Sequence, residues 1–267
     1  MTSNDLVLVV PCYNEASRLR APEFLGFVAR HPTARLLFVD DGSADATMAV
    51  LQRMVQEAPA AIRAMRLETN RGKAEAVRRG LLDALDGNPA LVGFWDADLS
   101  TPLSAIDDFL SVAAKFPSVE LILGSRVLLM GRDIRRKASR HYLGRIFATA
   151  ASLALDLPVY DTQCGAKVFR TTDALRRVLG TPFRSPWIFD VEILARYVGL
   201  PVDDGGGPRR SRIYELTVPV WHDVPGSKLR AWDFLRSIAE LVAIWRDRRS
   251  GRIRDVRPPT GRAGLPG

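Results

Sequence analysis

The sequence predicts an α/β fold, a Rossmann-like three-layer sandwich in which helices cover both faces of a mostly parallel central sheet. Apolar runs rich in β-branched residues recur along the chain, and a short polar loop and a helical stretch follow each of them. This strand, loop and helix repeat makes a parallel sheet with right-handed crossovers. A length of 267 residues suits a domain of this class.

The first half of the chain gives the clearest elements. A strand is expected over 6–10, where Pro11 ends the apolar run, and a helix follows through about residue 30. Continuous apolar character predicts further strands at 36–39, 64–67, 91–95 and 121–123. Between them, helices are expected at 45–57 and 74–85, with Ser43 as the N-cap of the first.

The second half is less regular. It predicts a strand at 168–169, helices at 172–179 and 189–197, a strand at 214–220 and a last helix from 231 to 246. We expect one domain over 1–230, an amphipathic helix over 231–249 and a disordered tail over 250–267, because the tail is rich in Gly, Pro and Arg.

Composition limits the class of protein. Hydrophobic residues make up 47% and charged residues 25%, which excludes global disorder. Cys12 and Cys164 form neither a disulfide framework nor a zinc spacing, so a cytoplasmic location is expected. The formal net charge of +8 predicts an anionic partner. The sequence shows no signal peptide and no apolar window of about 18 residues that would span a bilayer.

Two carboxylates follow the strand expected at 91–95, Asp96 and Asp98, with only Ala97 between them. Alternate residues of an extended segment point the same way, so both carboxylates can face one cation. Oxygen ligands suit Mg²⁺ or Mn²⁺, which keep some waters and bridge substrate phosphates. We therefore predict a divalent-metal site here, with ordinary turn residues as the alternative.

Two more polar clusters should reach the same edge of the sheet, where ligand crevices form in open α/β folds. Asp40 and Asp41 can accept hydrogen bonds from ribose hydroxyls or from the N–H of a base. Gly72 permits close backbone approach, and Lys73 brings a cation to a helix N-terminus, which suits a diphosphate. The alternative for Lys73 is a solvated helix residue.

Together these motifs resemble the family 2 inverting glycosyltransferases of the GT-A fold. The matching segments are VPCYNE at 10–15, VDDGS at 39–43, NRGK at 70–73, DAD at 96–98 and GSR at 124–126. The second half is similar to the dolichyl-phosphate and polyprenyl-phosphate β-glucosyltransferases of that family. There the segments are DTQCGAKVF at 161–169, WIFDVE at 187–192 and VPGSKL at 224–229.

The resemblance implies a nucleotide-sugar donor, with UDP-glucose favoured. The residues that would line the nucleoside are Pro11, Tyr13, Asn14 and Glu15. Asp41 would contact the base and Lys73 the diphosphate. Asp96 would lie near the ribose and the metal, with Asp98 as the main metal ligand. Arg126 would face the acceptor or the leaving diphosphate.

The acceptor that the resemblance implies is a polyprenyl or dolichyl phosphate. A phosphate monoester, whose second pKa is about 6, is already an anion at neutral pH and needs cations more than a base. The residues expected to bind it are Arg135, Arg136, Arg140 and His141, with Gln163 shaping the pocket. A solvated basic face is the alternative.

A hydroxyl acceptor would instead need a carboxylate base. The candidates are Asp161, Asp190 and Glu192, although the last two are also favourable charges at a helix N-terminus. The catalytic residues are accordingly expected to be Asp98, Arg126 and Asp190.

The last predicted helix carries an apolar stripe with arginines beside it, which is typical of a helix at a membrane interface. The stripe consists of Trp232, Leu235, Ile238, Val242 and Trp245. Residues 146–147 and 153–155 could form a second such surface. A helix packed on the core is the alternative.

We therefore expect a cytoplasmic glycosyltransferase, peripheral on the membrane, that moves a hexose to a polyprenyl phosphate. Two alternatives stay open: an enzyme of the same fold with a soluble acceptor, or a polyprenyl-phosphate mannosyltransferase that uses GDP-mannose. Nucleic acid is not an expected partner, because the carboxylates at the strand ends would repel its phosphates.

Overall fold

The structure is a computed structural model that describes residues 5–135, 138–202, 207–222 and 231–251, apart from the side chains of 138–143 and 231–235. The strands are β1 (Leu6–Cys12), β2 (Ala34–Asp40), β3 (Ile62–Arg66), β4 (Leu91–Trp95), β5 (Leu121–Ser125), β6 (Asp133–Arg135), β7 (Ala166–Arg170), β8 (Ile213–Thr217) and β9 (Val220–His222). The helices are α1 (Ala21–Arg30), α2 (Thr47–Glu57), α3 (Lys73–Asp86), α4 (Ile106–Lys115), α5 (Ala138–Leu155), α6 (Asp173–Leu179), α7 (Phe189–Gly199) and α8 (Ala231–Arg249). Short 3₁₀ turns occur at Leu103–Ala105 and Arg209–Arg212.

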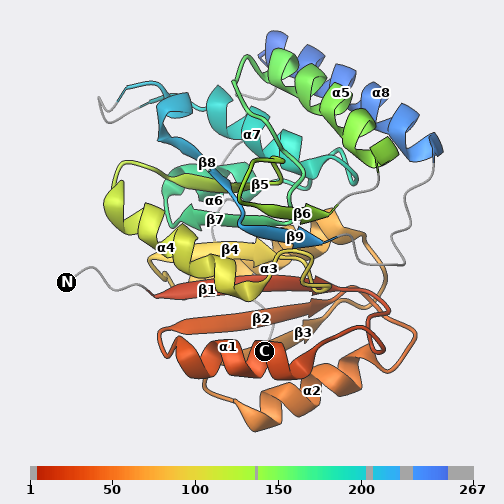
Figure 1. The fold of residues 1–267 in the computed structure, drawn as a ribbon, viewed down its shortest axis with the longest axis vertical. Helices are drawn as coiled ribbons and strands as arrows, with labels where there is room; N and C mark the ends of the chain where they lie inside the picture. Colours follow the sequence, from red (N-terminus) through yellow and green to blue (C-terminus); the bar gives the residue numbers. More distant parts are fainter. Residues whose placement is uncertain (1–4, 136–137, 203–206, 223–230, 252–267) are drawn as a thin grey trace, which may run out of the picture.

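A seven-stranded sheet with the order β3-β2-β1-β4-β7-β5-β8 forms the centre (Figure 1). Its neighbouring strands are parallel except at β7, which runs antiparallel to both β4 and β5. Strands β6 and β9 pair in parallel as a separate two-stranded sheet. The mostly parallel sheet predicted from the sequence is confirmed.

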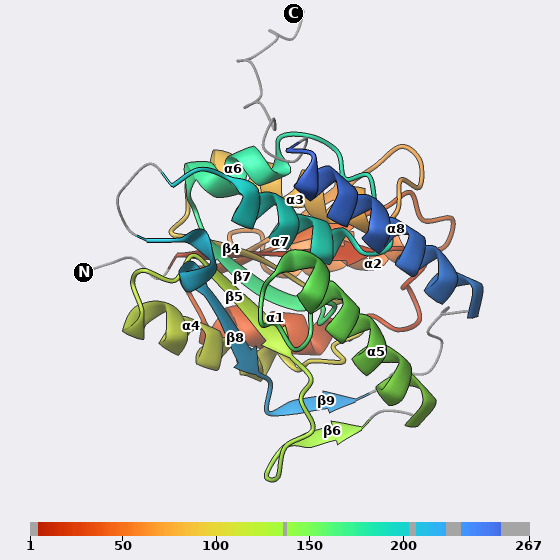
Figure 2. The same ribbon diagram turned by 90° about the horizontal axis from the view of Figure 1, so that it is seen from above.

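Alternation along the central strands fills both faces of the sheet. On β1, Val7 and Val9 join a core cluster with α3, α6 and α7, whereas Leu6, Leu8 and Val10 join a second cluster with α1, α2 and α4. Successive side chains of a strand point to opposite faces, so a strand covered on both sides is apolar at nearly every position. Helices α5 and α8 lie side by side and cover α7 (Figures 1 and 2).

The antiparallel strand β7 is important for the site. Its first residue, Ala166, pairs with Trp95, the last residue of β4. The loop that enters β7 is thereby brought to the edge of the sheet where β4 ends. Here the backbone N–H of Asp96 donates to the carbonyl of Gly165 at 2.9 Å.

Two sequence predictions differ from the structure. Ser43 is not the cap of α2, because that helix begins at Thr47 after Ala46 and has no side-chain cap. The hydroxyl of Ser43 instead accepts a hydrogen bond from the backbone N–H of Asn14 at 2.9 Å. The strand expected at 214–220 is divided between β8 and β9. The tail predicted to be disordered lies outside the described residues from 252 onward.

The last helix packs on the body of the protein, and Ile238 is the one described side chain of its predicted stripe that does so. Leu241 and Ile244 are buried and Ile238 packs against the core, whereas Val242 and Trp245 are exposed. The side chains of Trp232 and Leu235 lie outside the described part. In the described part of the chain, no helix has the length and apolar character needed to cross a bilayer.

The close packing of α3 on the sheet gives a first prediction. A Cβ at Gly80 would overlap the Cγ1 of Val9 and lie 2.8 Å from the Cγ2 of Val39. Overpacking of this kind costs about 1–3 kcal/mol, so Gly80→Ala should lower the free energy of unfolding by that amount in urea denaturation. Gly87→Ala is the control, because its Cβ meets nothing closer than 3.6 Å. Equal stability of the two variants would contradict the packing described.

Candidate active site

The loops that follow β1, β2 and β4 meet at one edge of the sheet, toward which these strands point in Figure 1. The loop before β7 reaches this edge as well, since β7 runs the opposite way. The predicted donor and metal residues all lie in these loops or directly beside them.

The loops after β1 and β2 are hydrogen-bonded to each other. The carboxamide Oδ1 of Asn14 accepts from the backbone N–H of Ala44 at 3.0 Å, and Thr47 Oγ1 accepts from the backbone N–H of Glu15 at 2.8 Å. Asn14 adopts φ +54°, which Asn tolerates better than most residues. These bonds form a rigid wall that presents Tyr13, 38% exposed, at its surface.

Asp41 joins the end of β2 to the loop before α3. Its two carboxylate oxygens accept hydrogen bonds from the backbone N–H groups of Arg71, at 2.7 Å, and Gly72, at 2.8 Å. Burial raises the pKa of Asp41 and outweighs the effect of these hydrogen bonds. Because each carboxylate oxygen has two lone pairs, Asp41 retains acceptor capacity for a ligand N–H.

Lys73, the first residue of α3, forms an ion pair with Asp96 across the edge. Burial would lower the pKa of Lys73, but the negative charges of Asp96, Asp190 and Asp98 raise it, so the ammonium stays protonated. Asp190 and Asp98 therefore lie close enough to Lys73 to raise the pKa of its ammonium group.

Gly165 keeps space free for the Asp96 carboxylate. A Cβ at position 165 would overlap both carboxylate oxygens of Asp96. Any other residue there would displace either the loop before β7 or the carboxylate, so this glycine is required by close approach.

The turn after β4 holds Asp98. Asp98 Oδ1 accepts from the backbone N–H of Ser100 at 2.9 Å, and Leu99 adopts φ +53°. The guanidinium of Arg20 donates to the carbonyls of Asp98, at 3.3 Å, and Leu99, at 3.2 Å. The turn is thus fixed from both sides.

This arrangement fits a divalent cation of the Mg²⁺ or Mn²⁺ type. Such ions need only one or two protein carboxylates when substrate phosphates and water complete the coordination. Asp96 and Asp98 supply that number, and Gly165 leaves room for the Asp96 carboxylate in its present position. Over the described residues, no group of three or more His, Cys, Asp or Glu side chains could hold a metal alone.

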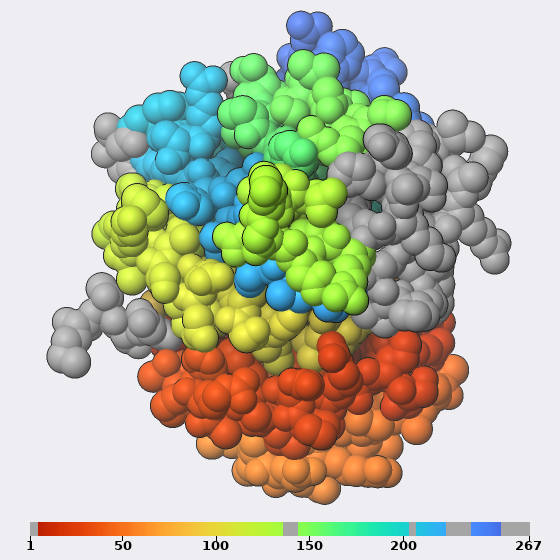
Figure 3. Space-filling model, in the orientation of Figure 1, coloured from red at the N-terminus to blue at the C-terminus, as the bar shows by residue number. Residues whose placement is uncertain are grey.

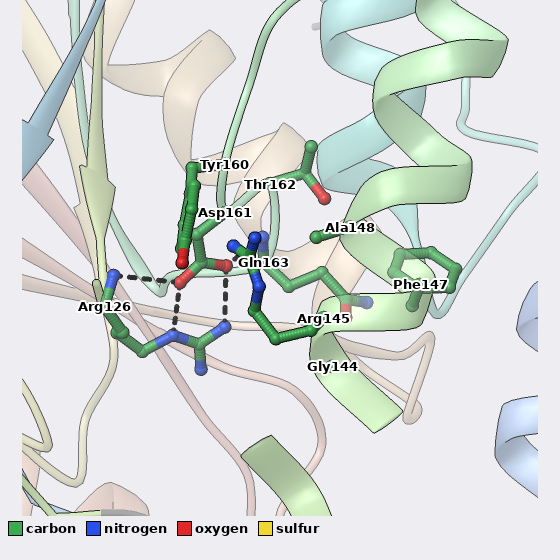
Figure 4. Close-up of a pocket in the computed structure, with 9 residues that line it drawn as sticks. All are labelled: Arg126, Gly144, Arg145, Phe147, Ala148, Tyr160, Asp161, Thr162 and Gln163. Carbon is green, nitrogen blue, oxygen red and sulfur yellow. Dashed lines mark hydrogen bonds and ion pairs between the residues drawn. The ribbon is translucent and has the colours of Figure 1, made fainter. Parts of the chain in front are cut away.

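Arg126 and Asp161 form a two-pronged ion pair beside this edge (Figure 4). Arg126 Nε and Nη2 donate to the Asp161 carboxylate at 2.6 and 2.8 Å, and the Arg126 backbone N–H donates to it at 3.0 Å. Burial would lower the pKa of Arg126, but Asp161 raises it, with smaller contributions from Cys164 and Asp96. Asp161 lies on the loop that also carries Gly165, whose backbone approaches the Asp96 carboxylate.

A pocket opens next to this pair between α5 and the loop before β7. Its lining residues are Arg126, Gly144, Arg145, Phe147, Ala148, Tyr160, Asp161, Thr162 and Gln163. The Arg145 guanidinium lies 3.4 Å from the centroid of the Tyr160 ring. In Figure 4 the guanidinium groups of Arg126 and Arg145 lie beside Asp161, whereas the side chain of Gln163 runs toward Phe147.

Asp190 is paired with a fully buried lysine. Lys167 Nζ lies 2.6 Å from Asp190 Oδ1 and donates to the carbonyl of Cys164 at 2.5 Å. Glu192, the other candidate base on α7, accepts from the backbone N–H of Ser185 at 3.0 Å and from Arg196 at 2.6 Å. The bond from Ser185 ties α7 to the segment before it.

The predicted acceptor residues separate into three groups. Gln163 lines the pocket. Arg135 is exposed on β6 and paired with Asp133, to which His222 also bonds at 2.8 Å. Arg136 lies outside the described residues, as do the side chains of Arg140 and His141 on α5.

In the sequence, Arg145 does not stand out from the other basic residues of 132–145. Its distinguishing feature is the stack on Tyr160, fifteen positions away in sequence, which only the fold reveals. Gly165 was likewise missed, because its importance comes from Asp96, which lies in the loop after β4.

Comparison with known proteins identifies the class. The sequence pattern described as "Glycosyl transferase family 2" matches residues 7–176. The chain belongs to this family and is a glycosyltransferase, as the sequence resemblance predicted.

More particular relatives are the dolichyl-phosphate beta-glucosyltransferases. That of Drosophila melanogaster is 32% identical over 91% of this chain and 75% of its own length. That of Dictyostelium discoideum is 31% identical over 90% and 76%. That of Saccharomyces cerevisiae is 29% identical over 90% and 73%.

Solved structures support the GT-A fold. Glucosyl-3-phosphoglycerate synthase from Mycobacterium tuberculosis, in complex with Mn²⁺, UDP-glucose and phosphoglyceric acid, has a TM-score of 0.61 at 17% identity, over 90% of this chain and 79% of its own. A mannosyltransferase from Pyrobaculum calidifontis, in complex with GDP-Man and Mn²⁺, has a TM-score of 0.60 at 20% identity, over 96% and 66%.

The Arg126–Asp161 pair gives a second prediction. Its side chains are only 14% and 11% exposed, and removal of one partner from a buried pair costs about 3–5 kcal/mol. Asp161→Ala should therefore lower the free energy of unfolding by this order in urea denaturation. In the control Asp133→Ala the ion pair lost is exposed, and stability should hardly change. A similar loss in both variants would contradict the difference in burial.

Proposed function

We propose that this protein transfers glucose from UDP-glucose to the phosphate of a polyprenyl phosphate, with inversion at the anomeric carbon. The relatives named above are dolichyl-phosphate beta-glucosyltransferases. The observation that carries the proposal is the position of two arginines. Arg126 and Arg145 line one pocket, and the loop that lines this pocket at 160–163 continues to Gly165, which lies against the carboxylate of Asp96 in the metal motif.

On the donor side, the wall formed by the loops after β1 and β2 holds the nucleoside. Pro11, Tyr13, Asn14 and Glu15 line it, and Asp41 accepts the N–H of the base. Lys73 exchanges its ion pair with Asp96 for the diphosphate, which presents a stronger negative charge. Asp96 and Asp98 would hold Mg²⁺ or Mn²⁺, and a bound cation would stabilise the negative charge of the departing diphosphate.

On the acceptor side, Arg126 and Arg145 bind the phosphate and Gln163 orients it. Asp161 holds the Arg126 guanidinium in place through two hydrogen bonds. The phosphate is already an anion at neutral pH, so the attacking oxygen needs no base. Asp190, paired with Lys167, contributes its charge near Lys73 instead of removing a proton.

The proposal places the enzyme at a membrane surface, because a polyprenyl phosphate is a lipid. We infer a peripheral position on the cytoplasmic face, in keeping with the two free cysteines, Cys12 and Cys164, both buried.

A transfer assay tests the function. The full chain is incubated with Mn²⁺ and either radiolabelled UDP-glucose or GDP-mannose, in the presence of a polyprenyl phosphate, the corresponding polyprenol or 3-phosphoglycerate. We expect label in the lipid fraction only with UDP-glucose and the polyprenyl phosphate. Transfer of label from GDP-mannose to the lipid would overturn UDP-glucose as the donor. Transfer only to 3-phosphoglycerate would overturn the polyprenyl phosphate as the acceptor.

The acceptor pocket gives a third prediction. A charge-assisted hydrogen bond to phosphate is stronger than a neutral one, and its loss typically costs tenfold or more in affinity. Arg145→Ala should therefore raise the KM for polyprenyl phosphate by about tenfold or more. The affinity for UDP should stay within about twofold, as Arg145 does not belong to the donor wall. Steady-state kinetics and calorimetric titration measure the two effects.

Arg210→Ala serves as the control for this experiment. Arg210 is also a surface arginine, 58% exposed, but it lies on a 3₁₀ turn outside the pocket. An equal rise of KM in this variant would indicate a general effect of charge and contradict a specific role for Arg145.

A further inference from the structure

The loop between β5 and β6 presents three consecutive large apolar side chains to solvent. Leu128 is 61% exposed, Leu129 50% and Met130 fully exposed. Among the described residues, this apolar tip is the only run of consecutive large hydrophobic residues that are all exposed. Single exposed hydrophobic residues are ordinary, but a group of them on a soluble surface usually marks an interaction site.

The apolar tip is supported at both ends. Before it, Arg126 is bound to Asp161. After it, the backbone N–H of Arg132 donates to the carbonyl of Leu129 at 3.1 Å, and Asp133 N–H donates to the carbonyl of Pro219 at 3.0 Å. Gly131 adopts φ +81°, which makes the turn possible. These hydrogen bonds fix the loop on both sides of the apolar tip, so that the tip projects from the surface.

Figures 2 and 3 agree on where the loop with the apolar tip lies. Figure 2 shows the loop extending beyond β6 and β9, away from the central sheet. In Figure 3 the yellow-green segment that contains it stands out between α4 and α5. The tip lies on the face of the molecule to which the β6–β9 sheet belongs.

The charges next to the tip favour an anionic surface. Residues 126–135 contain three arginines, at 126, 132 and 135, against the acid Asp133, and Asp161 pairs with Arg126, which leaves a net charge of +1 over these five groups. Apolar side chains with cations beside them are typical of segments that enter a membrane surface containing anionic lipids.

The spacing between Arg126 and the apolar tip suits insertion of the tip into such a membrane surface. Leu129 is three positions after Arg126, and an extended chain of that length spans at most about 10 Å. Apolar groups of interfacial segments enter the bilayer by about 5–10 Å below the head groups. If the tip enters to that depth, Arg126 lies at the level of the lipid phosphates.

We propose that the apolar tip, Leu128, Leu129 and Met130, inserts into the surface of a lipid bilayer and holds the pocket of Arg126 and Arg145 at the level of the lipid phosphates. The inference rests on the proposed function, in which the acceptor is a lipid. A bilayer fits the tip better than a protein partner does. A stable protein interface buries about 800 Å² on each side, which three side chains cannot supply, whereas a bilayer requires no complementary shape.

Flotation with vesicles tests the proposal. The full chain is mixed with vesicles of phosphatidylcholine and phosphatidylglycerol, and the bound fraction is measured for the wild type and for Leu128→Ser/Leu129→Ser/Met130→Ser. We expect the triple variant to lose at least about tenfold in partition, because three apolar side chains are withdrawn from lipid.

The matched control is Leu153→Ser/Val242→Ser/Trp245→Ser, which removes three exposed apolar side chains from α5 and α8. It should retain wild-type binding within about threefold. Absence of binding by the wild type, equal binding by the tip variant or a greater loss in the control would overturn the proposal. Loss of a dimer in the tip variant, with vesicle binding retained, would assign the tip to a second copy of the chain and overturn it too.

A second measurement separates this inference from the proposed function. Glucose transfer to a short-chain, water-soluble polyprenyl phosphate is measured without vesicles, where the tip variant should match the wild type within about twofold. A wild type that binds vesicles through the tip but does not transfer glucose would contradict the proposed function alone. A tip variant that is inactive with the soluble acceptor would show that the tip acts on catalysis directly, and would overturn the proposal.

Discussion

The carboxylates at one edge of the sheet can lie so close together only because each has its own compensating partner. Asp41 accepts two backbone N–H groups, Asp96 pairs with Lys73, Asp161 with Arg126 and Asp190 with Lys167. Without such partners, buried carboxylates would repel one another and take up protons. The fold therefore supplies cations and N–H groups at the places where the strands end.

Three of these pairs differ in exposure, in a way that matches their proposed roles. The Lys73–Asp96 pair is partly exposed, at 44% and 31%, so an anionic ligand and a cation can replace its members. In contrast, Lys167 is fully buried and pairs with Asp190. Arg126 is fixed as well, because its guanidinium donates two hydrogen bonds to the Asp161 carboxylate. In the proposed function, the site thus combines one exchangeable pair on the donor side with fixed pairs that maintain its shape.

The sequence predicted the layered fold and the edge where the functional residues gather, because parallel strands bring their carboxyl ends together whatever the order of the strands. It did not predict that β7 would insert antiparallel between β4 and β5, since that pairing depends on the whole sheet. For this reason the sequence missed Gly165 and Arg145, whose partners lie elsewhere in the chain. The misplaced cap at Ser43 has the same origin, because its hydroxyl bonds to the loop after β1 instead of to α2.

The central claim is that Asp96 and Asp98 bind the donor diphosphate through a divalent cation. Calorimetric titration of UDP into the wild type and into Asp98→Asn, each with Mn²⁺ and then with excess EDTA, tests it most directly. We predict that the wild type loses at least about tenfold in UDP affinity when Mn²⁺ is chelated, whereas the variant binds UDP weakly under both conditions. Equal affinity of the wild type with Mn²⁺ and with EDTA would contradict the account.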